Sequence, residues 1–261
     1  MKQILQKVVQ MAVLLLLAAG TGGCGAVEQA ETEQAETKQE ETAAAEQKKA
    51  AAEKTAVYEI ASVWTGKEEN IDKAVLENGS AVVKVADGTL YGSGVLWSTD
   101  GEQLIVVTNQ HVIREGDSGS ITFADGTNAS FSVLFSDAER DVAFLGVRLL
   151  ALSEQTRRAV RLVSCSAGCY EALESGSEIG LVGTAGDGSR ISYIGEVIDR
   201  AWAVSDFEIP MLYVKSQAEP GMSGGGMFDA HGHYVGMLTG GNGDECAGVP
   251  FPVLWEIFRN F

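Results

Sequence analysis

The chain has 261 residues, of which 36 are acidic and 19 are Lys or Arg, so its formal net charge is −17 at pH 7. So strong an acidic balance disfavours nucleic acid and anionic lipid headgroups as partners. A basic or unfolded polypeptide is compatible with this charge, although acidity alone identifies no substrate.

The N-terminus has the layout of a secretory signal. Lys2 and Lys7 precede an apolar run from Val8 to Ala19, which is too short to span a bilayer comfortably. Small residues then lead to Cys24. We therefore expect residues 1–23 to be a signal peptide and the mature protein to be exported.

The segment Thr21-Gly22-Gly23-Cys24 resembles a bacterial lipobox, although leucine is usual where Thr21 stands. The resemblance implies that Cys24 becomes the lipid-modified first residue and anchors the protein to the cell membrane, facing outward. Ordinary cleavage with secretion and an uncleaved anchor are the alternatives. Residues 24–55 are low in complexity and repeat Glu28 to Thr32 at once as Glu33 to Thr37, which indicates a solvated tether without a core of its own.

Residues 56–261 form the predicted folded domain. Apolar residues with helical spacing, among them Val57, Ile60, Val63 and Trp64, predict a leading helix between Thr55 and Leu76. Short β-rich runs between Gly, Asp and Ser turns then predict an antiparallel sheet protein. The expected strands are 81–85, 92–97, 104–108, 120–123, 130–135, 142–147, 178–183, 192–198, 212–216, 225–228, 234–239 and 248–251.

These strands form two sets of six, which predicts an all-β fold of two six-stranded antiparallel β-barrels, about 78–150 and about 176–252. Two closed barrels bury their sheet edges and leave a cleft between them. A short helix follows, with its apolar face formed by Val253, Leu254, Ile257, Phe258 and Phe261. The prediction leaves no residues for a PDZ domain.

Three segments supply the groups of a Ser-His-Asp triad in the order His111, Asp141, Ser223. A serine hydroxyl is a weak nucleophile unless an imidazole takes its proton, and a carboxylate orients that imidazole. Asp137 is a competing acid, but it lies in a turn and we expect it to be solvated. His111 and Asp141 fall in the first barrel and Ser223 in the second, which predicts a catalytic site across the cleft.

Residues 221–225 also fit the Gly-x-Ser-x-Gly elbow of α/β-hydrolases. That fold needs an acid and then a histidine after the serine. The later histidines, His231 and His233, follow too closely for an intervening strand and helix. The elbow is therefore the weaker interpretation.

Four motifs in order resemble the chymotrypsin-like serine peptidases, and among them the bacterial HtrA (Deg) group. They are Gly92-Ser93-Gly94-Val95, Thr108 to Val112, Asp141-Val142-Ala143 and Gly221-Met222-Ser223-Gly224-Gly225. The resemblance covers about residues 75–261 and implies a trypsin-like serine endopeptidase. The backbone N–H groups of Gly221 and Ser223 would form its oxyanion hole. Relatives in the HtrA group commonly form trimers, although nothing in this sequence requires it.

Met222 departs from the family, which has asparagine there in the HtrA group and aspartate in trypsin-type zymogens. Methionine carries no charge to pair with a newly freed N-terminus. We therefore expect no activation by trypsin-like N-terminal insertion.

Substrate-binding residues are expected from the same resemblance. Gln217 stands where trypsin carries its pocket carboxylate, so a preference for Lys or Arg is not expected. Thr239-Gly240-Gly241 resembles the strand that pairs with the substrate backbone. A small or medium apolar residue before the cleaved bond is the expected preference.

With Cys24 assigned to lipid, the remaining cysteines are Cys165, Cys169 and Cys246. A disulfide between Cys165 and Cys169 and buried free thiols are both open. The pair His231 and His233 could bind a metal, but Asp229 to Gly232 is more typical of a hairpin turn. We therefore expect neither a metal nor a cofactor.

The leading hypothesis is a membrane-tethered serine endopeptidase that acts on exported or misfolded proteins. The first alternative is a catalytically silent or switchable relative that binds peptides in the same cleft. A nonenzymatic solute-binding lipoprotein would need two α/β domains and more chain than is present.

Overall fold

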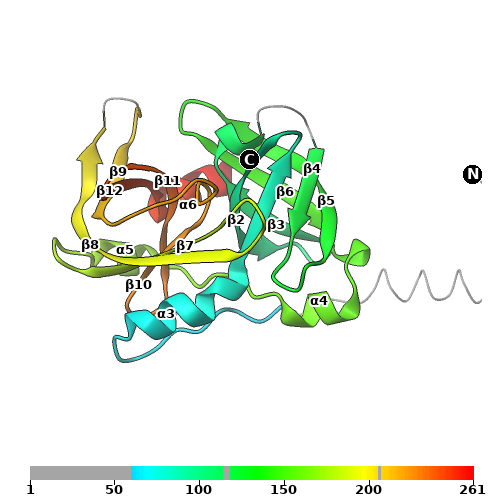
Figure 1. Cartoon of the computed structure of the whole chain (residues 1–261), viewed down its shortest axis with the longest axis horizontal. Coiled ribbons are helices and arrows are strands. Elements are labelled where there is room, and N and C mark those ends of the chain that lie inside the picture. The colour runs from blue at the N-terminus through cyan, green and yellow to red at the C-terminus, as the bar shows by residue number, and fades with distance from the viewer. Residues whose placement is uncertain (1–59, 114–117, 205–206) are drawn as a thin grey trace, which may run out of the picture. The chain divides into compact units, whose positions relative to one another are not determined.

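The computed structural model describes residues 60–113, 118–204 and 207–261. Two closed antiparallel barrels form the framework of this part of the chain (Figure 1). Barrel one contains β1 (Val82–Asp87), β2 (Leu90–Thr99), β3 (Gln103–Thr108), β4 (Ser118–Thr122), β5 (Asn128–Asp137) and β6 (Val142–Arg148). Barrel two contains β7 (Glu178–Thr184), β8 (Arg190–Ala203), β9 (Pro210–Lys215), β10 (Gly226–Asp229), β11 (Tyr234–Asn242) and β12 (Glu245–Pro250). The predicted pair of six-stranded barrels is thus confirmed.

The two barrels have the same topology. The strand order around barrel one is β1-β2-β3-β6-β5-β4, and around barrel two it is β7-β8-β9-β12-β11-β10. In each barrel the third strand therefore lies beside the sixth. This shared order decides which loops come together at the candidate site.

Some strands carry an unbroken run of apolar residues because both of their faces are covered. In β3, Leu104 and Val106 belong to the core inside barrel one, while Ile105 and Val107 belong to a second core shared with barrel two. Successive side chains of a strand point to opposite faces, so one run of apolar residues serves both cores. The strand β6 divides its residues in the same way.

The core shared by the barrels is rich in aromatic residues. Trp97 of β2 contacts Phe144 of β6, Tyr234 of β11 and Phe251, with ring centroids 5.8, 5.9 and 5.7 Å away. Phe251 opens the predicted C-terminal helix, α6 (Phe251–Asn260). The buried residues of α6 also include Leu254 and Ile257, so this helix packs onto the junction of the two barrels.

The leading helix is shorter than predicted. Helix α3 (Ile71–Asn78) begins where the side chain of Asn70 accepts a hydrogen bond from the N–H of Lys73. Val63 is not helical, because its N–H donates to the carbonyl of Leu162. The prediction of a helix over Val63 and Trp64 was wrong because contacts with distant segments hold this stretch extended.

Short helices occupy the connection between the barrels and the approaches to the strands. They are η1 (Gly79–Ala81), η2 (Gln110–Ile113), η3 (Leu149–Ala151), α4 (Glu154–Ala159) and α5 (Ala167–Glu171). None of the helices in the described ranges has the length and apolar composition needed to cross a membrane. The predicted signal peptide, Cys24 and the 24–55 tether lie outside the described residues.

Candidate active site

His111 and Asp141 are brought together by neighbouring strands. His111 lies in η2 directly after β3, Asp141 directly precedes β6, and these two strands are paired. Nδ1 of His111 lies 2.8 Å from Oδ2 of Asp141, and the backbone N–H of His111 donates to Oδ1 at 2.9 Å. A carboxylate only accepts hydrogen bonds, so Nδ1 carries the proton and Nε2 is left as the basic nitrogen.

Asp141 has a backbone conformation that L-residues rarely adopt, with φ at 53°. Such a residue costs on the order of 1 kcal/mol and persists only where its surroundings hold it. Here Asn109 donates a hydrogen bond from its side chain to the Asp141 carbonyl at 2.9 Å. The fully buried Asn109 also donates to Oγ1 of Thr239 at 3.0 Å, so it links the acid to barrel two.

Asp137, the competing acid, has a different environment. Its carboxylate accepts hydrogen bonds from the N–H groups of Glu139 and Arg140 and from the Arg140 guanidinium, at 2.7 to 3.0 Å. Burial favours the neutral acid, but the bonds from Arg140 outweigh it and lower the pKa of Asp137. The acid beside His111 is therefore Asp141.

Ser223 lies in the loop between β9 and β10 of barrel two. Its Oγ donates to the carbonyl oxygen of Thr239 at 3.0 Å. Among the residues that the structure describes, no hydrogen bond joins Ser223 to His111. The structure thus pairs the predicted base with the predicted acid, while the predicted nucleophile is hydrogen-bonded elsewhere.

Two backbone donors flank the Ser223 side chain. The N–H groups of Met222, Gly224 and Gly225 donate to Glu219, Leu238 and Met222 respectively. Within the described part of the chain, the N–H groups of Gly221 and Ser223 have no acceptor. These are the two donors expected for the oxyanion hole.

Glycine is required at two positions of this loop. Gly221 has φ at 100°, and a Cβ there would lie 2.5 Å from the carbonyl oxygen of Thr184. Gly224 has φ at 86°, and its Cβ would lie 2.0 Å from the carbonyl oxygen of Ser93. A side chain at either position would displace the loop that carries Ser223 from the neighbouring strands.

Ser93 of barrel one binds this loop at two points. Its N–H donates to the carbonyl oxygen of Ser223 at 2.7 Å, and its Oγ donates to that of Gly221 at 2.7 Å. The same Oγ accepts the N–H of Thr184 at 2.8 Å. Ser93 therefore holds the carbonyl groups of Gly221 and Ser223, the two residues expected to form the oxyanion hole, a role that the motif alone did not predict.

Met222 is buried beneath the loop and is only 1% exposed. Its side chain packs on Gly183, where an added Cβ would come within 2.9 Å of it. A buried apolar side chain thus occupies the position at which a trypsin-type zymogen has a charged group.

The predicted substrate-binding residues lie near the C-terminal ends of β9 and β11 in barrel two. Thr239 is buried in β11, whereas Gly240, Gly241 and Gln217 are exposed. A Cβ on Gly241 would lie 3.0 Å from the sulfur of Cys246. Burial raises the pKa of the Cys246 thiol to about 11, so this thiol is neutral near pH 7. No sequence signal pointed to Cys246 here.

The structure also shows the state of the cysteines and the turn that carries the two histidines. Cys165, Cys169 and Cys246 are free thiols, so the disulfide that the sequence left open is not formed. The N–H of Gly232 donates to the carbonyl of Asp229 at 2.9 Å, which confirms the hairpin turn.

The sequence of this chain resembles those of known proteins. A model of the trypsin-like peptidase domain matches residues 92–237, which is more than half of the chain. The chain belongs to this family. The matched range includes His111, Asp141 and Ser223, together with Ser93 and Asn109.

Relatives of this trypsin-like chain include HtrA-type proteins. HhoB of Synechocystis sp. is 26% identical over 174 residues, which cover 65% of this chain and 38% of HhoB. Serine protease Do-like HtrB of Bacillus subtilis is 25% identical over 171 residues, which cover 61% of this chain and 35% of HtrB. The chain spans about a third of the length of the curated relatives it matches.

Solved structures support the chymotrypsin-like fold. HtrA-type protease AlgW, solved with a tripeptide, has a TM-score of 0.62 at 20% identity, covering 73% of this chain and 62% of AlgW. The Rv3671c protease in its inactive form has a TM-score of 0.60 at 20% identity, covering 77% of this chain and 98% of that protein. These likenesses confirm the predicted chymotrypsin-like fold, and the HtrA-type sequence relatives bear out the predicted resemblance to the HtrA group.

Proposed function

We propose that the protein is a serine endopeptidase in which His111, Asp141 and Ser223 form the triad. Ser223 attacks the scissile carbonyl while its proton passes to Nε2 of His111, and the returned proton leaves with the amine product as the C–N bond breaks. Water then hydrolyses the acyl-enzyme by the same proton transfers. Asp141 orients the imidazole and stabilises its cation.

The observation that carries this proposal is the pair of N–H groups on Gly221 and Ser223, which have no acceptor within the described residues while their loop neighbours are bonded. Two such donors stabilise the negative oxygen of the tetrahedral intermediate, and the loss of one costs about a hundred- to a thousandfold in rate. Ser93 supports them by holding the carbonyls of the same two residues.

The bond from Ser223 Oγ to the Thr239 carbonyl favours a second candidate, a switchable relative of the same fold. The hydroxyl must turn from Thr239 toward His111 before it can lose its proton. In a switchable protein, peptide binding along Thr239, Gly240 and Gly241 would cause that turn.

We further assign the peptidase domain to residues 56–261, with residues 24–55 as its tether and residues 1–23 as its signal peptide. The protein would be exported and held outside the cell membrane by a lipid on Cys24, or secreted. Exported or misfolded polypeptides would be its substrates, and a trimer its possible assembly. Support comes from the N-terminal sequence and from relatives described as periplasmic endoproteases.

A fluorophosphonate probe tests the proposal, because it reacts only with a serine made nucleophilic by its site. We expect the purified protein to be labelled without proteolytic trimming, since Met222 cannot form a zymogen-type ion pair. Labelling should be absent in Ser223→Ala and slowed by on the order of 10⁴-fold in His111→Ala. His231→Ala, which changes a histidine outside the site, should be labelled like the wild type.

If the folded wild type remains unlabelled with the probe alone but is labelled once a peptide is added, the switchable relative is the correct interpretation. If it binds peptide and is never labelled, the protein is not a peptidase.

A further inference from the structure

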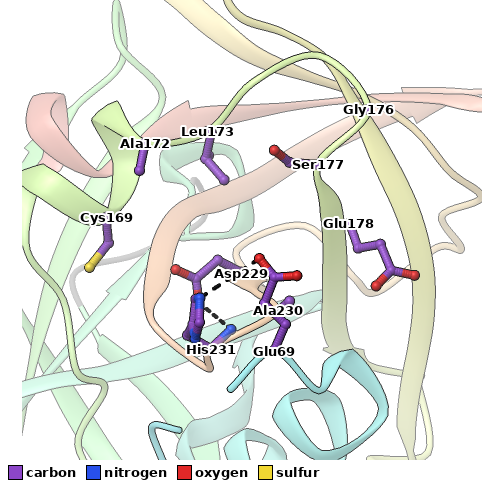
Figure 2. A pocket seen from close by; sticks show the side chains of 10 residues that line it. All are labelled: Glu69, Cys169, Ala172, Leu173, Gly176, Ser177, Glu178, Asp229, Ala230 and His231. Atoms are coloured by element: carbon purple, nitrogen blue, oxygen red, sulfur yellow. Dashed lines mark hydrogen bonds and ion pairs between the residues drawn. The ribbon is translucent and has the colours of Figure 1, made fainter. Parts of the chain in front are cut away.

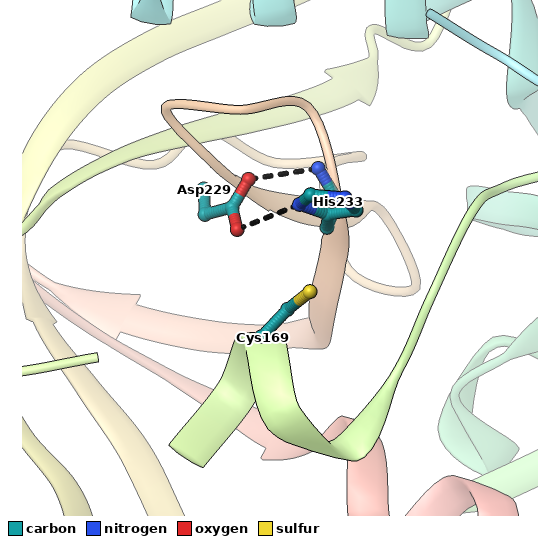
Figure 3. A group of neighbouring side chains, drawn as sticks. All are labelled: Cys169, Asp229 and His233. Atoms are coloured by element: carbon teal, nitrogen blue, oxygen red, sulfur yellow. Dashed lines mark hydrogen bonds and ion pairs between the residues drawn. The ribbon is translucent and has the colours of Figure 1, made fainter. Parts of the chain in front are cut away.

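A cluster of three ligand-bearing side chains lies outside the candidate active site. Cys169 comes from α5 in the connection between the barrels, and Asp229 and His233 come from the two sides of the β10–β11 hairpin (Figure 3). One ligand atom from each residue lies within 4.8 Å of the other two. The proposed peptidase mechanism uses none of the three.

The hairpin holds two of the ligands in a defined geometry. Oδ1 of Asp229 accepts the N–H groups of His231 and His233 at 2.9 and 2.8 Å, which leaves Oδ2 directed at the His233 ring. Oδ2 lies 3.1 Å from Nδ1 of His233. Two ligand atoms about 2.0–2.1 Å from a tetrahedral ion lie about 3.3 Å apart, so an ion fits between them with little movement.

The third ligand is directed toward this pair. The Cys169 sulfur points at the hairpin in Figure 3, and it lies 3.0 Å from Oγ of Ser166. A bound ion would need the sulfur to move by on the order of 1 Å, since a Zn–S bond is about 2.3 Å long. Rotation of this half-buried side chain can supply that movement.

The donor set selects the metal. One thiolate, one imidazole and one carboxylate suit Zn²⁺, whereas Ca²⁺ and Mg²⁺ require oxygen ligands. The adjoining pocket is lined by Cys169 and Asp229 together with Glu69, Glu178 and His231 (Figure 2), and its volume is about 270 Å³. This pocket gives an ion a route from solvent and room for a water ligand.

We propose that Cys169, Asp229 and His233 bind Zn²⁺, with water in the fourth position. Binding releases the thiol proton to solvent, shifts the ring proton of His233 from Nδ1 to Nε2 by exchange with water, and replaces the hydrogen bond between Asp229 and His233 with two metal bonds. The ion would fasten α5 to the β10–β11 hairpin and so brace the connection between the barrels against barrel two. It requires Cys169 to be reduced, as it is in the structure.

The test is a Zn²⁺ titration of the purified, reduced full chain after treatment with a chelator, measured by competition with a chromophoric zinc indicator. We expect one tight site per chain and a higher melting temperature with Zn²⁺. Cys169→Ser and His233→Gln should each weaken binding by more than about 100-fold. Cys165→Ser, a matched change four residues away from Cys169, should bind like the wild type.

Cobalt supplies an independent readout. Co²⁺ in the site should show a thiolate charge-transfer absorption that is lost in Cys169→Ser and kept in Cys165→Ser. The proposal is overturned if the wild type binds no Zn²⁺, if Cys169→Ser and His233→Gln bind as tightly as the wild type, or if the control Cys165→Ser loses affinity equally. None of these outcomes depends on peptidase activity.

Discussion

At the scale of single residues, the candidate site depends on side chains that cannot react with a substrate. Ser93 and Asn109 are both fully buried, and each links barrel one to barrel two. The Ser93 hydroxyl and the Asn109 side-chain NH₂ group pair with the backbone or side chains of the site residues. The positions of the candidate catalytic groups therefore depend on hydrogen bonds that cross between the barrels.

Replacement of Ser93 by alanine tests this dependence. Ser93→Ala leaves the Gly221 carbonyl and the Thr184 N–H without their buried partner, which should cost about 1–3 kcal/mol of stability. Because the Gly221 peptide is then less well held, kcat should fall by about tenfold or more while KM changes little. Peptide hydrolysis and thermal unfolding measure the two effects.

Ser132→Ala is the matched control, since Ser132 is an exposed residue of β5. Its kcat and melting temperature should equal those of the wild type. An unchanged kcat in Ser93→Ala would show that the Ser93 hydroxyl does not position the oxyanion hole.

Asp137 gives a prediction for pH. Its pKa is lowered in the folded protein, so its ionised form adds stability above the unfolded pKa, and that stability is lost as pH falls through the folded pKa. Asp137→Asn keeps one acceptor oxygen for the N–H groups of Glu139 and Arg140 but removes the charge. The variant should be less stable at pH 7 by about 1 kcal/mol, because Arg140 loses its ion partner.

The difference between wild type and Asp137→Asn should shrink as pH falls below the ordinary carboxyl value of 3.8. Urea midpoints of both proteins between pH 7 and pH 3 measure it. A difference that stays constant over this range would mean that the charge of Asp137 does not stabilise the turn before Asp141.

At the scale of elements, the strands were predicted more completely than the helices. A barrel strand carries its signal locally, as a short apolar run between turn residues, and each predicted run matches an observed strand within a few residues. The prediction of the leading helix was wrong for this stretch because the N–H groups of Val63 and Gly66 donate to the carbonyls of Leu162 and His231. Both acceptors are far away in the sequence. The local spacing of apolar residues cannot reveal long-range hydrogen bonds that compete with a helix.

Helix α6 is the element that covers the junction of the barrels, and Leu254 is its fully buried residue. Leu254→Ala should lower the free energy of unfolding by about 2–5 kcal/mol, because it leaves a cavity in the shared core. Glu256→Ala, an exposed change on the same helix, should shift it by no more than about 0.5 kcal/mol. Denaturant unfolding compares the two, and equal effects would mean that α6 is not part of the cooperative core.

At the scale of the whole molecule, the sequence predicted the architecture and the three candidate catalytic residues, but not their support. His111, Asp141 and Ser223 stand in recognisable motifs, whereas Ser93 meets Thr184 and Gly221 across 91 and 128 residues. The approach of Cys169 to Asp229 and His233 likewise arises from the packing of α5 on the hairpin. Contacts between barrels depend on the complete fold, so they have no local signature.

The fluorescence emission of Trp97 can report on the junction of the barrels. Its indole is 5% exposed and is surrounded by rings from β6, β11 and α6, whereas Trp202 and Trp255 are 47% and 42% exposed. An indole in such apolar surroundings emits at shorter wavelength than one in water. The emission of a chain whose other tryptophans are replaced by phenylalanine therefore reports, in real time, whether the two barrels stay docked while a peptide enters and leaves.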